Sequence, residues 1–227
     1  MSIRTTPREP GSTRPGTPPV GAPPDCPLCA RLVSYRHSNQ MNNPTWHNGA
    51  VPSFGPVDAR LLIVGLAPGV RGANRTGRPF TGDFAGVLLY HTLLKFGLAE
   101  GRYGADPADG LILNDCRVTN AVRCVPPGNL PTPAEITACN PFLSNELAAM
   151  PRLRAVLALG GVSHRAVLRA RGLRASHTAF QHGAIHALPD GLLVADSYHV
   201  SRLNTNTGRL TTPMFEAVVA AILQRMA

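Results

Sequence analysis

Residues 61–69 have the sequence Leu-Leu-Ile-Val-Gly-Leu-Ala-Pro-Gly, and the architecture of the chain follows from this segment. Its first four residues are all apolar, and such an uninterrupted run predicts a strand that is buried on both faces of a sheet. Gly65 and Pro68 end the strand and open a glycine-rich loop. Ligands gather where loops leave the carboxyl ends of parallel strands, so this loop is the first candidate for a functional site.

The rest of the chain alternates strand patterns with helix patterns. Apolar runs predict further extended segments at 111–113, 118–122, 155–159 and 192–195. Apolar spacing and capping residues predict helices at 84–97, 132–150, 160–171 and 213–226. Short apolar strands that alternate with helices indicate an α/β fold, in which a mostly parallel sheet is covered by helices on both faces.

The first 24 residues differ in composition from the rest. They contain seven prolines and three glycines but hardly any apolar side chain, so nothing there offsets the entropy of ordering. We expect a disordered basic tail at residues 1–24 and a single domain at 25–227. The longest apolar run, residues 61–68, is far shorter than the roughly 20 residues that cross a bilayer. No apolar stretch at the N-terminus resembles a signal peptide, so we expect a cytoplasmic protein.

The charge of the chain favours a polyanionic partner. There are 22 Lys and Arg residues against 13 Asp and Glu residues, a formal net charge of +9. Such an excess is the usual footprint of a protein that meets nucleic acid. Lys95 is the only lysine, and codon bias in a GC-rich genome explains the preference for arginine.

Four of the five cysteines form two pairs. Cys26 and Cys29 make a C-x2-C pair, and Cys124 and Cys139 are separated by 14 residues. The pairing predicts one site with four thiolate ligands. Structural zinc and a 4Fe-4S cluster both accept four thiolates, and the spacing alone slightly favours zinc. Cys116 is left over, and we expect it to be a small buried side chain.

Two loops carry polar residues that are typical of a functional site. One loop lies before the middle of the chain and the other lies after it. Residues 65–83 combine glycines with three arginines, Phe80 and Asp83, so backbone amides can approach an anion while the aromatic ring stacks on a base. A nucleotide-binding turn fits this loop almost as well, although its usual glycine motifs are absent. Residues 198–209 form a polar loop with His199, and its apolar Leu203 is suited to wedge between base pairs.

Together these features resemble the family 5 uracil-DNA glycosylases of bacteria and archaea. The resemblance rests on the four cysteines, on GLAPG and GANRTGRPFTGD between residues 65 and 83, on VTNAVRCVPPGN at 118–129, and on HVSRLNTNTGRL at 199–210. It covers nearly all of residues 26–227. It implies a three-layer α/β/α sandwich, a 4Fe-4S cluster rather than zinc, and excision of uracil and other damaged bases from DNA. Cys116, Val200 in place of a usual proline, and the proline-rich tail depart from the family pattern.

The resemblance also implies roles for individual residues. Asp83 and His199 are the expected catalytic pair, since Leu66 and Ala67 cannot activate water. Phe80, Asn120 and the backbone around Ala67 and Gly69 are expected to hold the extruded base. The residues expected to contact DNA are Gly161, Ser163, Ser201, Arg202, Leu203, Asn204 and Arg209, and those expected to hold the cluster are Cys26, Cys29, Cys124 and Cys139.

Two other functions fit parts of the sequence. A zinc-stapled, non-catalytic nucleic-acid-binding domain accounts for the charge and the cysteines, and a nucleotide-handling α/β enzyme accounts for the first loop. Neither explains the second loop. We therefore expect a monomeric glycosylase that acts on uracil-containing DNA and associates with the nucleoid while doing so.

Overall fold

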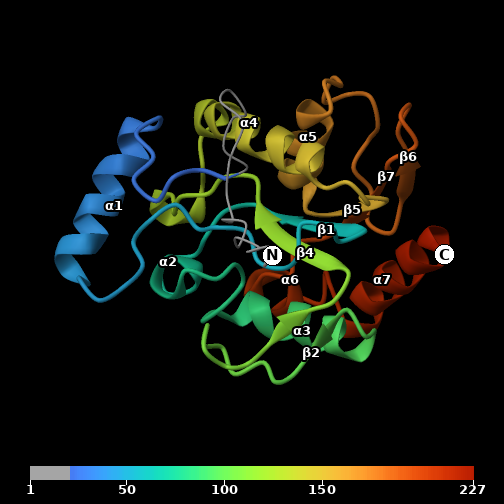
Figure 1. The fold of residues 1–227 in the computed structure, drawn as a ribbon, viewed down its shortest axis with the longest axis horizontal. Coiled ribbons are helices and arrows are strands. Elements are labelled where there is room, and N and C mark those ends of the chain that lie inside the picture. Colours follow the sequence, from blue (N-terminus) through green and yellow to red (C-terminus); the bar gives the residue numbers. More distant parts are fainter. Residues whose placement is uncertain (1–20) are drawn as a thin grey trace, which may run out of the picture.

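The computed structural model describes residues 21–227 (Figure 1), so most of the predicted tail lies outside the described residues. The central sheet has five strands, β1 (Leu61–Gly65), β4 (Cys116–Asn120), β5 (Ala155–Leu159), β6 (Ile185–Ala187) and β7 (Leu193–Ser197). Their order is β4-β1-β5-β7-β6. Every neighbouring pair is parallel except β6 with β7. The prediction of a mostly parallel sheet is confirmed.

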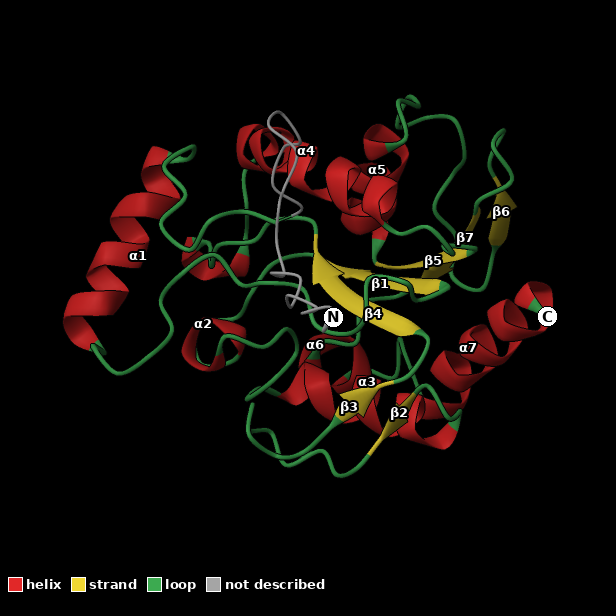
Figure 2. Ribbon diagram, in the orientation of Figure 1, coloured by secondary structure: helices red, strands yellow, loops and turns green. Residues whose placement is uncertain are grey.

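Helices cover both faces of the sheet, which makes three layers (Figure 2). The structure has the helices α1 (Ala30–Asn42), α2 (Ala73–Thr76), α3 (Phe84–Lys95), α4 (Pro133–Ala149), α5 (Gly161–Ala170), α6 (Arg202–Asn206) and α7 (Thr212–Met226), with a short 3-10 turn at Pro127–Asn129. On one face lie α4 and α5, and on the other lie α3 and α7.

Alternation along the strands builds a separate core on each face. In β1, Leu61 and Ile63 pack with residues of α3 and α7. Their neighbours Leu62 and Val64 pack with residues of α4 and α5. All four side chains are fully buried, because successive residues of a strand point to opposite faces and both faces of this sheet are covered.

Two predicted features differ from the structure. The segment at 111–113 does not join the main sheet: β3 (Ile112–Leu113) pairs with β2 (Ala99–Glu100) in a separate two-stranded sheet. The loop at 198–209 contains the short helix α6, whose N-cap is Ser201. The parallel strands β1, β4, β5 and β7 all end at one edge of the sheet, where they bring the two predicted loops together. In the described part of the chain, no helix is both long and apolar enough to span a membrane.

Candidate active site

A groove of about 490 Å³ lies at the carboxyl edge of the sheet. It is lined by Leu66, Ala67, Gly69, Val70, Arg71, Gly72, Asp83, Phe84, Ala85, Asn129, His199, Ser201 and Arg202. Six of these residues were predicted for the site from the sequence, and they come from segments more than 100 residues apart. Asn129 and Arg71 were not predicted. Asn129 belongs to the PPGN segment, and only the position of this segment after β4 could have indicated from the sequence that Asn129 lines the site.

Asp83 is held at the start of α3. It is the N-cap residue of that helix, and its carboxylate accepts a hydrogen bond from the Ala85 amide at 3.2 Å. Burial raises the pKa of the Asp83 carboxyl above its usual value, although the amides of Gly86 and Ala85 act in the opposite direction. A side chain at Gly72 would collide with this carboxylate. Glycine at that position therefore lets the first loop fold closely around Asp83.

Phe80 and Asn120 converge over the last residue of β1. A Cβ atom at Gly65 would overlap both the Phe80 ring and the Asn120 side-chain oxygen, so glycine is needed there. The ring of Phe80 also lies 6.1 Å from the His199 ring, measured between centroids. Asn120 is buried, yet its amide makes no hydrogen bond to any residue between 21 and 227. Its donor and acceptor are therefore free for a ligand.

A buried ion pair fixes the loop that carries Phe80 and Asp83. The Arg78 guanidinium donates to both oxygens of Asp109 at 2.8 and 2.7 Å and lies over the rings of Phe54, Tyr90 and Tyr103.

Hydrogen bonds from neighbouring side chains extend this support along the loop. Arg78 Nε donates to the Thr81 hydroxyl at 2.7 Å, Tyr90 to the Pro79 carbonyl at 2.6 Å, and Tyr103 to the Phe80 carbonyl at 3.1 Å. Phe80 has a φ of 52°, an uncommon left-handed conformation for a bulky residue. These contacts hold it there, and none of them was predicted.

His199 is placed opposite Asp83 by the end of β7 and by α6. The Asn204 amide donates to the His199 carbonyl at 2.8 Å, and the backbone of Gly160 lies against the histidine. Burial lowers the pKa of His199 to about 4. The imidazole is therefore neutral at physiological pH, and a neutral ring can donate one hydrogen bond to a developing anion.

Five of the residues predicted to contact DNA are at least partly exposed in the structure. Leu203 is 72% exposed at the start of α6, and Arg202 and Arg209 are also exposed there, over the rings of Phe84 and Tyr198 respectively. Ser201 in the groove wall and Gly161 at the start of α5 are half-buried.

Two other residues of this set are held by contacts within the protein. Ser163 is fully buried and its hydroxyl donates to the Leu159 carbonyl at 3.1 Å, so its side chain does not face the groove. The contact of the backbone amides at the start of α5 with a phosphate stays a prediction. The Asn204 amide donates to the His199 carbonyl, and its contact with DNA stays a prediction.

The four paired cysteines line one small apolar pocket together with Leu32, Val122 and Phe142. Cys29 caps α1, Cys124 follows β4, and Cys139 lies within α4. Burial raises the pKa of Cys124 to about 11 and also raises the pKa values of Cys29 and Cys139. Two groups near the sulfurs favour the thiolate form: Arg36 Nη1 lies 3.9 Å from Cys124 Sγ, and the Arg123 amide donates to Cys139 Sγ at 3.3 Å.

The separation of the sulfur atoms distinguishes the two kinds of four-thiolate site. Among residues 21–227, the only group of three or more His, Cys, Asp or Glu ligand atoms within 4.8 Å of one another is His164, His186 and Asp196. The cysteine sulfurs are thus more widely spread than a single zinc ion requires, since Zn–S bonds of about 2.3 Å place tetrahedral ligands about 3.8 Å apart. The wider arrangement fits a multi-iron cluster. Cys116 stays apart, buried, with its thiol donating to the Leu98 carbonyl.

Comparison with known proteins places this site in a family context. A family model described as the uracil DNA glycosylase superfamily matches residues 52–223. The chain is 46% identical over 200 residues to a type-5 uracil-DNA glycosylase from Thermus thermophilus, which covers 86% of this chain and 90% of that protein. It is 43% identical over 202 residues to a type-5 uracil-DNA glycosylase from Mycobacterium leprae, covering 85% and 88%. A type-4 uracil-DNA glycosylase from Pyrobaculum aerophilum is 34% identical over 131 residues, covering 57% and 59%.

Proposed function

Because the chain belongs to the uracil DNA glycosylase superfamily, we infer that it is a monofunctional DNA glycosylase of base excision repair. It hydrolyses the N-glycosidic bond of uracil and other deaminated or damaged bases in DNA and leaves an abasic site. The observation that carries this function is that Asp83 and His199 line one groove beside Phe80 and Asn120. Neither the zinc-stapled binding domain nor the nucleotide-handling enzyme accounts for that convergence.

The base must leave the duplex before the bond can break. Extrusion costs a few kcal/mol of unstacking, which contacts to the backbone and a wedge offset. The exposure of Leu203 supports its role as the wedge. Arg202, Arg209, Ser201 and Gly161 are accessible on the same edge and are suited to hold the flanking phosphates.

Inside the pocket the extruded base stacks on Phe80. The free amide of Asn120 has both the donor and the acceptor that match uracil O4 and N3–H. The backbone of Ala67 and Gly69 completes the wall of the groove. Asn120 is thus the residue that distinguishes one base from another.

Bond cleavage separates charge, with the anion on the base and the cation on the sugar. Preorganised groups that face this charge contribute most to the rate. The neutral His199 imidazole donates to the base oxygen on which negative charge grows. The Asp83 carboxylate faces the sugar and positions the water that completes hydrolysis. Because departure of the base precedes attack, one modest carboxylate suffices for the water.

A cleavage assay tests the function and its base preference. A duplex with one uracil, hypoxanthine, xanthine or ethenocytosine is incubated with the enzyme and then treated with alkali, which breaks the strand at each abasic site. We expect the wild-type enzyme to cleave the uracil-containing strand. We expect Asn120→Ala to lose more activity on uracil than on the other bases. DNA binding without any strand break would instead support a non-catalytic binding domain.

We also propose that Cys26, Cys29, Cys124 and Cys139 hold a 4Fe-4S cluster. The spread of their sulfurs and the Arg36 guanidinium beside Cys124 support it. When bound, the cluster would join α1, which has only Leu32, Arg36 and Asn39 buried, to the segment after β4 and to α4.

Colour and iron content test the cluster. We expect brown protein with a broad absorbance band near about 400 nm and about four irons per chain. Cys139→Ala should lose the colour and speed amide exchange in α1, whereas Cys116→Ala should keep both unchanged. Colourless, active protein with stoichiometric zinc would overturn the proposal. We further propose that the enzyme works as a monomer in the cytoplasm, at the nucleoid.

A further inference from the structure

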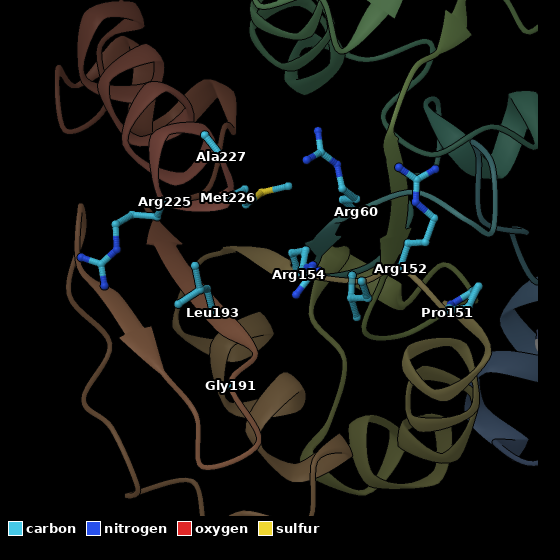
Figure 3. Close-up of a pocket in the computed structure, with 10 residues that line it drawn as sticks. Arg60, Pro151, Arg152, Arg154, Gly191, Leu193, Arg225, Met226 and Ala227 are labelled. Carbon is cyan, nitrogen blue, oxygen red and sulfur yellow. The ribbon is translucent and has the colours of Figure 1, made fainter.

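A second hollow lies at the edge of the sheet opposite the active-site groove (Figure 3). It has a volume of about 900 Å³ and is lined by Arg60, Pro151, Arg152, Leu153, Arg154, Gly191, Leu193, Arg225, Met226 and Ala227. Arg60 and Arg154 directly precede β1 and β5, whose other ends carry the active-site loops. Strands of five residues at about 3.3 Å each separate the two sites by about 16 Å of sheet.

The four arginines of this pocket are incompletely neutralised. Arg60 Nε donates to Asp115 at 2.6 Å, which accounts for one of them. Arg152 has only a 3.8 Å ion pair with Asp58, and both side chains are mostly exposed, so that pair contributes little. Arg154 and Arg225 have no acidic partner anywhere between residues 21 and 227. Arg154 and Arg225 therefore contribute positive charge that a bound anion would neutralise.

The remaining side chains of the pocket are apolar. They belong to Pro151, Leu153, Leu193 and Met226, and Figure 3 shows Leu193 and Met226 between Arg225 and Arg154. In Figure 3, Arg60 and Arg152 extend in the same direction, whereas the side chain of Arg225, on the far side of Met226, extends away from them. A ligand that fits has negative charges at the rim and an apolar group between them. Guanidinium groups bind carboxylates through paired hydrogen bonds, so carboxylates match this rim well.

We propose that this pocket binds an acidic peptide segment of a partner protein, with an apolar side chain inserted between the arginines. A nucleic acid fits less well for two reasons. No aromatic side chain lines the pocket on which a base could stack. The pocket is also concave, whereas a duplex is a broad convex surface that touches only rim side chains. The partner is thus recruited on the side of the enzyme away from its DNA substrate.

Fluorescence anisotropy with synthetic peptides tests the proposal. The probe is fluorescein-labelled Asp-Asp-Glu-Leu-Asp-Asp, and the comparison peptide has Ser in place of Leu. Any affinity tag is placed at the N-terminus, because Ala227 lines the pocket. We expect the Leu peptide to bind at least about tenfold more tightly than the Ser peptide. Arg154→Glu with Arg225→Glu should weaken binding about tenfold or more.

Matched controls separate the pocket from the overall charge of the protein. Arg102→Glu with Arg174→Glu changes the net charge equally at exposed positions outside the pocket, and it should leave peptide binding near wild type. Both double variants should retain the wild-type melting temperature and rate of uracil excision. Three results would overturn the proposal. The two peptides bind equally well, or both double variants lose peptide affinity to the same extent. In the third, a single-stranded oligonucleotide displaces the peptide from enzyme whose active site is already saturated.

Discussion

Asp83 and His199 face the same groove, but burial acts on them in different ways. For Asp83 burial raises the pKa, and for His199 burial lowers the pKa to about 4. Both changes favour the neutral form of the group. At neutral pH the histidine is therefore uncharged, and the Asp83 carboxyl loses its proton at a higher pH than an ordinary aspartate does. The proposed charge separation requires a neutral histidine beside the base and an ionised Asp83 beside the sugar.

Removing either group should slow chemistry without weakening DNA binding. We expect Asp83→Asn and His199→Ala each to lower the single-turnover rate by about 10²- to 10³-fold, because each loses one preorganised group that faces transition-state charge. DNA affinity, measured with an uncleavable duplex, should stay near wild type. Full single-turnover activity of Asp83→Asn on every base would show that backbone groups alone hold the water.

The pH dependence of the same reaction follows from the two pKa shifts. Because Asp83 must be ionised, the wild-type rate should fall on the acid side at a pH above the usual aspartate value. His199 should add no step near pH 6.5, since its pKa is about 4. A single-turnover profile between pH 4 and 9 measures both effects. A clear titration near 6.5 that disappears in His199→Ala would contradict the neutral histidine.

Tyr103 is a positioning residue for Phe80. Its hydroxyl donates to the Phe80 carbonyl at 3.1 Å, and Tyr103 itself does not line the groove. Tyr103→Phe keeps the ring over which Arg78 lies but removes that hydrogen bond. We expect the single-turnover rate to fall about tenfold with an unchanged melting temperature, since a small misplacement of the stacking ring is costly. An equal fall in rate and in stability would indicate a purely structural role.

At the scale of elements, the apolar runs were good predictors. The strand at 155–159 and the helices α3, α4, α5 and α7 lie where the sequence places them, to within two residues at most ends. The Thr132 capping box is present in the structure. These elements carry their own signal because each buries a continuous apolar surface against the sheet.

Elements without such a surface were missed. Helix α1 has no apolar stripe, and it is held instead by the cysteine pocket and by the ion pair from Arg31 to Glu135. Strand β6 has three half-exposed or exposed residues at the edge of the sheet. The same reason applies to the site. Asp83 and His199 stand out in their loops, whereas the ion pair from Arg78 to Asp109 that supports the first loop depends on tertiary packing.

Helix α6 presents Leu203 to the substrate, which leads to a test of the wedge. Leu203→Ala should reduce excision from duplex DNA more than excision from a single strand, because only the duplex requires a base to be pushed out and its gap filled. Single-turnover rates on both substrates measure the difference. Ile112→Ala, which shortens an exposed apolar side chain in β3, is the control and should affect neither rate. Equal losses on the two substrates would exclude a wedge.

At the scale of the whole molecule, a buried histidine links stability to pH. His164 Nδ1 lies 2.8 Å from Asp196 Oδ1, and its Nε2 lies 3.0 Å from the Thr178 carbonyl. The Asp196 carboxylate and the Thr178 carbonyl are acceptors, and the Thr178 hydroxyl lies 3.4 Å from Nε2, so the protonated imidazole can donate to both acceptors. Burial alone would lower the pKa of His164, but the hydrogen bonds to Asp196 and Thr178 outweigh it and hold the pKa above its usual value.

This shift predicts the direction in which stability changes. A raised folded-state pKa means that the stabilisation is fully present below the unfolded pKa of about 6.5 and is lost as pH rises through the folded-state pKa. His164→Leu, which leaves Asp196 without its buried cation, should cost about 3–5 kcal/mol at pH 6.

The difference in free energy of unfolding between the wild type and His164→Leu should narrow as the pH rises toward 9. Urea unfolding at several pH values measures this difference, and the exposed His177, replaced by alanine, serves as the control that should change neither value. Asp196 also accepts from His186 at 3.1 Å, and Arg165 lies near His164, so subtracting the variant curve isolates the contribution of His164 from theirs. A difference that is constant from pH 6 to 9 would show that His164 is neutral in the folded protein.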